Sequence, residues 1–144
     1  MTEGLDYKKW WLGRYTRLNF EINVALRSIA AMRDLAMHTT QTLDAPAIQS
    51  GQADKTANIV SGIVDAEIKV DKMVDELRGL KTETLAAINS LPDPAEAKLL
   101  ADHYIRGITF VDIAKRAGKG YRWVMYKYES ALKNVYIDNT GGSG

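Results

Sequence analysis

The chain has 144 residues, of which 46% are hydrophobic and 26% charged, a composition typical of one folded domain or of two small domains that share a core. No apolar run approaches the 18 residues of a membrane span, and the absence of cysteine excludes disulfides and thiolate metal sites, so we expect a cytoplasmic protein. The net charge of +1 is unevenly spread: residues 38–94 carry nine acidic and five basic side chains, and residues 95–144 carry five and eight.

Two long heptad seams occupy the first two thirds of the chain. Within each seam apolar or small residues recur at alternating spacings of three and four, without proline, which predicts helices about 40 and 50 Å long. Residues 1–6 show no secretory-signal pattern. The first seam consists of Trp11, Tyr15, Leu18, Ile22, Ala25, Ile29, Met32 and Ala36, and the second of Ile59, Ile63, Ala66, Val70, Met73, Leu77, Leu80, Thr84, Ala87 and Leu91.

The stretch from His38 to Gln52 separates the seams and is rich in threonine, with Pro46 and Gly51, which predicts a loop. Either Ser50 or Asp54 would begin the second helix. A loop of this length lets residues 5–91 fold as an antiparallel helical hairpin that resembles a coiled coil. The last turns of the second helix then extend past the first seam, and residues 5–12 or the C-terminal segment would have to cover them.

The apolar stripe is too wide for two helices alone, because further apolar residues such as Leu26 and Val64 lie beside the seams. We therefore expect the hairpin to self-associate, as a homodimer or a higher homo-oligomer. The alternative is that the hairpin packs against the C-terminal helices of its own chain. The residues expected to form the oligomer interface are Trp11, Leu18, Ile22, Ile29, Ile63, Val70, Met73 and Leu77.

Residues 92–138 carry the signals of a small helical domain. Asp93 followed by Pro94 predicts a capped helix start, and that helix would stop at Gly107. Thr109 would cap a short helix that ends at Gly118, where the turn needs a positive φ. The last helix then begins near Gly120, and residues 139–144 would form a flexible tail. A short helix, a glycine turn and a second helix with an apolar inner face make a helix-turn-helix.

Six lysines and arginines but a single glutamate lie between Ile113 and Lys133, the charge pattern expected of a surface that contacts phosphates. If Val124 faces inward, Arg122 and Tyr126 point outward in the first two turns, where a recognition helix meets base edges. The alternative is a three-helix core with a basic surface. The residues expected to bind DNA are Lys115, Arg116, Lys119, Tyr121, Arg122, Met125, Tyr126 and Lys127.

Several segments of this motif carry a family resemblance: 104–107 (Tyr-Ile-Arg-Gly), 112–114 (Asp-Ile-Ala), 121–124 (Tyr-Arg-Trp-Val) and 131–132 (Ala-Leu). Over residues 85–136 the chain resembles the phage-encoded ArpU-like transcriptional regulators and, more widely, region 4 of sigma factors. The resemblance implies sequence-specific binding to double-stranded DNA, control of phage genes in a bacterial host cell, and base contacts at Arg122, Met125 and Tyr126. The chain departs from that pattern at Gly120, in place of a capping Ser or Thr, and at Lys127, where an apolar residue is common.

No constellation of catalytic or metal-ligating residues is recognisable, so we expect neither an enzyme nor a cofactor. His38 and His103 lack a carboxylate or cysteine at ligand spacing. Two other functions remain open. A small terminase-like subunit that recognises phage DNA for packaging also combines a helix-turn-helix with an oligomerising helix, and a helical module of this kind could instead bind RNA polymerase or a host protein.

Overall fold

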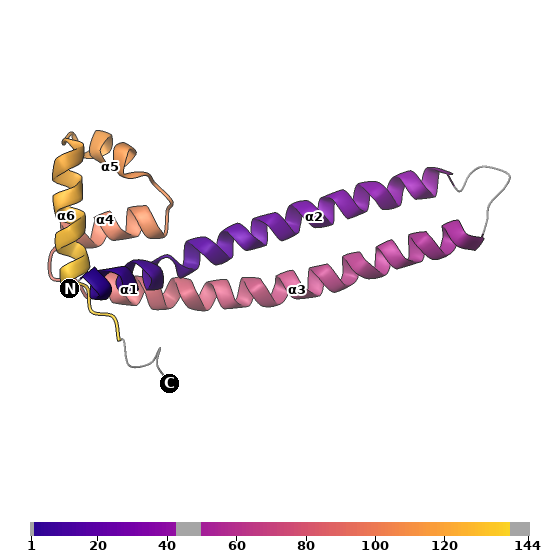
Figure 1. The fold of residues 1–144 in the computed structure, drawn as a ribbon, viewed down its shortest axis with the longest axis horizontal. Helices are drawn as coiled ribbons and strands as arrows, with labels where there is room; N and C mark the ends of the chain where they lie inside the picture. Colours follow the sequence, from indigo (N-terminus) through magenta and orange to yellow (C-terminus); the bar gives the residue numbers. More distant parts are fainter. Residues whose placement is uncertain (1, 43–49, 139–144) are drawn as a thin grey trace. The chain divides into compact units, whose positions relative to one another are not determined.

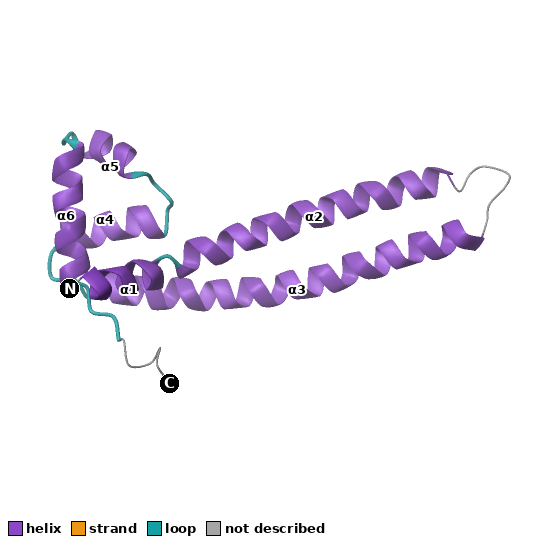
Figure 2. Cartoon of the chain, viewed as in Figure 1, coloured by secondary structure: helices purple, strands orange, loops and turns teal. Residues whose placement is uncertain are grey.

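The computed structural model describes residues 2–42 and 50–138, and within these ranges α-helices joined by short loops are the only regular secondary structure, as predicted (Figure 1, Figure 2). The chain divides into two compact units, one made of Met1–Arg17 with Leu77–Gly144 and the other of Leu18–Glu76. The helices are α1 (Thr2–Leu12), α2 (Arg14–Thr42), α3 (Ser50–Asn89), α4 (Pro94–Tyr104), α5 (Phe110–Ala117) and α6 (Tyr121–Asn134).

The unit of residues 18–76 consists of the facing parts of α2 and α3, which run antiparallel (Figure 1). The two seams meet between them, with Ile22, Ile29 and Ile63 buried. The Arg33 guanidinium lies 3.2 Å from the Glu67 carboxylate across the pair. Since the seam side chains of each helix are buried against the other, hydrophobic burial holds this unit together.

The helices of this unit are longer than predicted. α2 continues through the threonine-rich stretch to Thr42 and α3 begins at Ser50, so much of the predicted loop from His38 to Gln52 is helical. The remainder, residues 43–49, lies outside the described residues. Threonine has only a slightly lower helix propensity than most residues, whereas Pro46 is the first residue after the seam that a helix interior cannot accommodate. The predicted loop therefore began too early.

A break at Gly13 separates α1 from α2 and interrupts the helix that the first seam predicts from Trp11 onward. The hydrogen-bond ladder persists through the break, because Gly13 N–H donates to the Lys9 carbonyl and Arg17 N–H donates to the Gly13 carbonyl, each at 3.0 Å. A Cβ at position 13 would lie 2.9 Å from Arg17 Nη1 and 3.2 Å from the Lys9 oxygen. The glycine therefore leaves room for the Arg17 guanidinium, which a side chain at position 13 would displace.

The other unit is built around one large apolar cluster that joins both ends of the chain. Lys8 ties α1 to the end of α6, because its ammonium donates to the Leu132 carbonyl at 2.8 Å, and partial burial lowers the pKa of this lysine. The expected domain boundary between residues 91 and 92 does not separate compact units, since residues 5–17 and 77–91 share a core with the C-terminal helices. The buried members of the cluster are Leu12, Ile88, Leu91, Leu100, Tyr104, Ala131, Leu132, Val135 and Ile137.

Candidate nucleic-acid interface

Local capping interactions define α4, α5 and the turn before α6. Asp93 Oδ1 accepts a hydrogen bond from the Ala95 N–H at 2.9 Å, and Thr109 Oγ1 accepts one from the Asp112 N–H at 3.2 Å. Gly118 ends α5 with a φ of +65°, a left-handed conformation that glycine adopts without strain. The predicted caps at Asp93 and Thr109 and the predicted positive φ at Gly118 are confirmed.

The three helices close over a second, smaller core, formed by Leu99 of α4, Ile113 and Ala114 of α5 and Val124 of α6. Val124 is fully buried, and Ala114 is small enough to let α5 approach α6 closely. Burial of Val124 sets the rotation of α6. The side of α6 opposite Val124 is therefore free of packing against α4 and α5.

The outward side of α6 carries the residues that the sequence placed there. Arg122 and Tyr126 are one turn apart and both exposed, Tyr126 at 72%. Tyr121, at the first position of the helix, is also exposed. These three side chains need no rearrangement to reach a ligand.

Three cations surround the turn that precedes this helix. Lys115 and Arg116 lie on the last turn of α5 and are exposed, and Lys119 lies in the turn itself. The Lys119 ammonium is 5.5 Å from the centre of the Trp123 ring, a cation–π distance that restrains its side chain. The positive charge is therefore concentrated next to the N-terminal half of α6.

Two predicted DNA-binding residues, Met125 and Lys127, also have structural roles. Met125 is half-buried and packs against the core formed by α4, α5 and α6. Lys127 lies three residues after Val124 on the inward side, and its ammonium is 3.4 Å from the Asp93 carboxylate. The hydrogen bond from the Ala95 N–H, together with the charge of Lys127, lowers the pKa of Asp93. Lys127 thus connects the start of α4 to α6.

Sequence reasoning missed a polar clasp between α4 and α6. Glu96 is only 4% exposed, and its carboxylate accepts hydrogen bonds from Ser130 Oγ at 2.6 Å and from Asn134 Nδ2 at 3.1 Å. The signal was present in the spacing, because Ser130 and Asn134 are four residues apart on one side of α6. What no sequence pattern indicated was that Glu96 would lie opposite them.

An aromatic cluster fills the space between α4, the start of α5 and the middle of α6. His103 stacks on Phe110 with ring centres 3.9 Å apart, and its Nδ1 donates to the Ile108 carbonyl at 2.9 Å. The Tyr104 and Tyr128 hydroxyls are hydrogen-bonded to each other, and burial raises the pKa of both groups. His103 therefore packs between the end of α4 and the start of α5.

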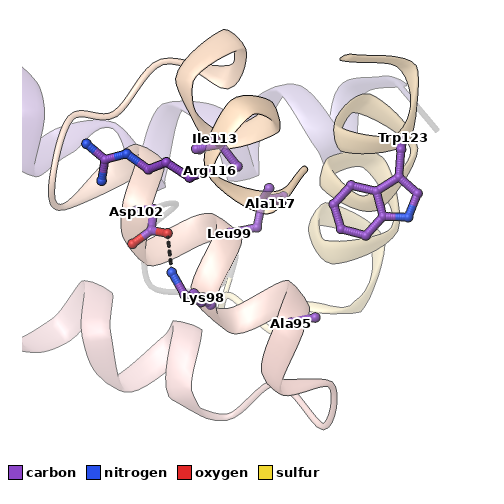
Figure 3. A pocket seen from close by; sticks show the side chains of 8 residues that line it. All are labelled: Ala95, Lys98, Leu99, Asp102, Ile113, Arg116, Ala117 and Trp123. Atoms are coloured by element: carbon purple, nitrogen blue, oxygen red, sulfur yellow. Dashed lines mark hydrogen bonds and ion pairs between the residues drawn. The ribbon is translucent and has the colours of Figure 1, made fainter. Parts of the chain in front are cut away.

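A small pocket opens between α4, α5 and α6, with Arg116 and Lys98 at its rim (Figure 3). Lys98 is 2.9 Å from Asp102, whose other oxygen lies 3.3 Å from Arg106. The pocket volume of about 190 Å³ is below that of an ordinary small-molecule site. Its lining residues are Ala95, Lys98, Leu99, Asp102, Ile113, Arg116, Ala117 and Trp123.

The residues expected to form an oligomer interface are largely buried within the chain itself. Five of them are buried between α2 and α3 or against neighbouring turns, namely Leu18, Ile22, Ile29, Ile63 and Val70. Trp11, Met73 and Leu77 are half-buried. Within one chain the seam already closes the α2–α3 pair, and the assignment of these residues to an oligomer interface stays a prediction.

Within residues 2–42 and 50–138 no three His, Cys, Asp or Glu side chains are grouped to hold a metal ion. In the same ranges no helix is long and apolar enough to cross a membrane. Comparison with known protein families, with curated proteins and with solved structures finds no match to this chain.

Proposed function

We propose that the protein is a sequence-specific DNA-binding transcriptional regulator of phage genes, with α6 as the helix that enters the major groove. The observation that carries the proposal is the exposed pair Arg122 and Tyr126, which lies opposite buried Val124 in the first two turns of α6. An arginine at this place in a recognition helix binds the O6 and N7 atoms of guanine, and a tyrosine contacts sugar, phosphate or a thymine methyl group.

The surrounding charges support the same reading. Lys115, Arg116 and Lys119 flank the turn between α5 and α6 without a carboxylate ion pair in the described structure. Cations at this place would neutralise backbone phosphates and set the register of the helix on the duplex. Base contacts by Arg122 and Tyr126 would then supply the sequence preference.

Selection of bound fragments from a phage genome tests the proposal directly. We expect the wild-type chain to enrich one sequence class, and the double variant Arg122→Ala/Tyr126→Ala to lose that enrichment while its helical circular dichroism stays unchanged. A matched control removes the same residue types from other exposed positions, Arg27→Ala/Tyr136→Ala, and should select the wild-type sequence.

Two other outcomes would replace the proposal. If the wild-type chain enriches no sequence but retains RNA polymerase or a host protein, the helix-turn-helix is a protein-binding module. If light scattering shows a ring of eight or more subunits, DNA recognition for packaging becomes the better description. Unchanged selection by the Arg122/Tyr126 double variant would contradict the assignment of these two residues.

We infer that a second copy of the chain covers one side of the α2–α3 pair. The Arg33–Glu67 ion pair lies on that side. Residues three, four or seven positions apart share a helix side, so Leu26 and Met37 lie with Arg33, and Val60 and Val64 lie with Glu67. These four are each 48–61% exposed.

Four large apolar side chains exposed on one side of a helix pair, with an ion pair between them, are typical of a surface that binds another protein. Self-association would cover it and give the regulator two DNA-binding units, and dimeric helix-turn-helix proteins read two half-sites in this way. The proposed interface is the side of Leu26, Met37, Val60 and Val64, in place of the seam.

A further inference from the structure

A groove with a basic lining lies beside the helix-turn-helix, at the break between α1 and α2. Lys9 and Arg17 come from the two sides of that break, and His103 comes from α4. The groove has a volume of about 390 Å³, and none of its lining residues is acidic. The complete lining is Lys9, Gly13, Thr16, Arg17, His103, Tyr104 and Gly107.

The cations of this groove are held in place by the fold. The Arg17 guanidinium donates from Nη2 to the Trp10 carbonyl at 2.6 Å and lies 5.3 Å from the centre of the Trp10 ring. These contacts engage one edge of the guanidinium, and arginine has five N–H donors, so others remain for a ligand. The Lys9 ammonium lies 6.0 Å from the centre of the Tyr128 ring. In the described residues neither cation forms an ion pair with a carboxylate.

The groove adjoins the first helix of the helix-turn-helix. Thr16 Oγ1 donates to the Tyr104 carbonyl at 3.0 Å, which ties the start of α2 to the end of α4. His103 stacks on Phe110, the first residue of α5. In helix-turn-helix complexes this first helix crosses the DNA backbone while the second enters the major groove. The basic groove therefore lies beside the N-terminus of the helix that would cross the backbone.

We propose that the groove is a second phosphate-binding site, in which Lys9 and Arg17 contact the DNA backbone beside the half-site read by α6. The assignment rests on the proposed DNA-binding function and extends it to the N-terminal helices. These contacts position the protein on the duplex without reading bases, because a phosphate carries no sequence information. Gly13 leaves room for the Arg17 guanidinium beside the groove, because Arg17 Nη1 lies 2.9 Å from where a Cβ at position 13 would be.

The salt dependence of binding tests the site. Each phosphate contact contributes about 0.9 to the slope of log affinity against log salt concentration. Lys9→Ala/Arg17→Ala should therefore lower the magnitude of the slope by about 2 and weaken binding to all DNA sequences by a similar factor, leaving the preference for the selected sequence unchanged. The control Lys69→Ala/Lys72→Ala removes the same charge from exposed positions of α3 and should keep the wild-type slope.

The outcomes separate the groove from the proposed function. A wild-type chain that binds no DNA overturns both, whereas specific binding with an unchanged slope in the double variant overturns the groove alone. If circular dichroism shows that loss of the Arg17 contacts unfolds the helices around Gly13, the single variant Lys9→Gln tests the phosphate site instead. Among the described residues the Lys9 side chain forms no hydrogen bond, and its replacement should lower the slope by about 1. A wild-type slope in that folded variant contradicts the site.

Discussion

Two glycines, two residues apart, have different roles at the turn before α6. Gly118 has a φ of +65° and meets the stereochemical need of the turn. Gly120 has a φ of −78° and a ψ of 158°, ordinary extended values, and no side chain caps α6 at this position. The sequence indicated both features, because a glycine at the end of an amphipathic helix predicts the turn, and the absence of Ser or Thr before Tyr121 predicts the missing cap.

Substitution at these two glycines should change stability in opposite directions. Gly120→Ser supplies an oxygen acceptor for the first N–H groups of α6, and a Cβ there meets no atom within 4 Å. We expect it to raise the free energy of unfolding by about 0.5 kcal/mol. Gly118→Ala should lower it by ~1 kcal/mol, because alanine is strained at positive φ. Urea denaturation measures both, and equal effects at the two positions would contradict this interpretation.

At the scale of helices, α4 and α6 are joined by polar as well as apolar contacts. Local patterns predicted where α4, α5 and α6 begin, since caps and glycine turns depend on neighbouring residues. They did not predict that Glu96 would be buried against Ser130 and Asn134, or that Lys127 would reach Asp93. Such pairings join residues more than 30 positions apart, and only the packing of the helices brings them together.

The clasp at Glu96 should contribute measurably to stability. Glu96→Ala removes a buried acceptor and leaves Ser130 and Asn134 without their partner, so we expect a loss of about 2 kcal/mol in the free energy of unfolding. Glu129→Ala is the matched control, because Glu129 is exposed and paired only with Lys133 along the same helix. Its effect should stay within about 0.5 kcal/mol. If thermal or urea melts show a similar loss of unfolding free energy for both variants, the buried contacts of Glu96 do not stabilise the protein more than an exposed ion pair does.

For the whole molecule, the proposed interface on the α2–α3 pair makes a prediction about mass. Leu26→Glu/Val64→Glu places like charges on the exposed apolar side and should reduce the particle from a dimer to the 16.0 kDa monomer in light scattering. Helical content should persist, because both side chains are about half exposed within one chain. The control Ser28→Glu/Asn58→Glu adds the same charge on other exposed sides of these helices and should remain dimeric. A monomeric wild-type chain at micromolar concentration would contradict the interface.

Some features of this chain follow from its local sequence, and others are decided only by the tertiary structure. The heptad seams, the prolines, the capping residues and Gly118 indicated an all-α chain and the limits of α4, α5 and α6, because helix periodicity and caps depend on residues within one or two turns of each other. Long-range packing decides which segment of the chain each apolar helix side contacts. Burial of the seams against each other, the shared core of both chain ends, the inward place of Lys127 and the basic groove at Gly13 follow from contacts between distant segments, which no local pattern encodes.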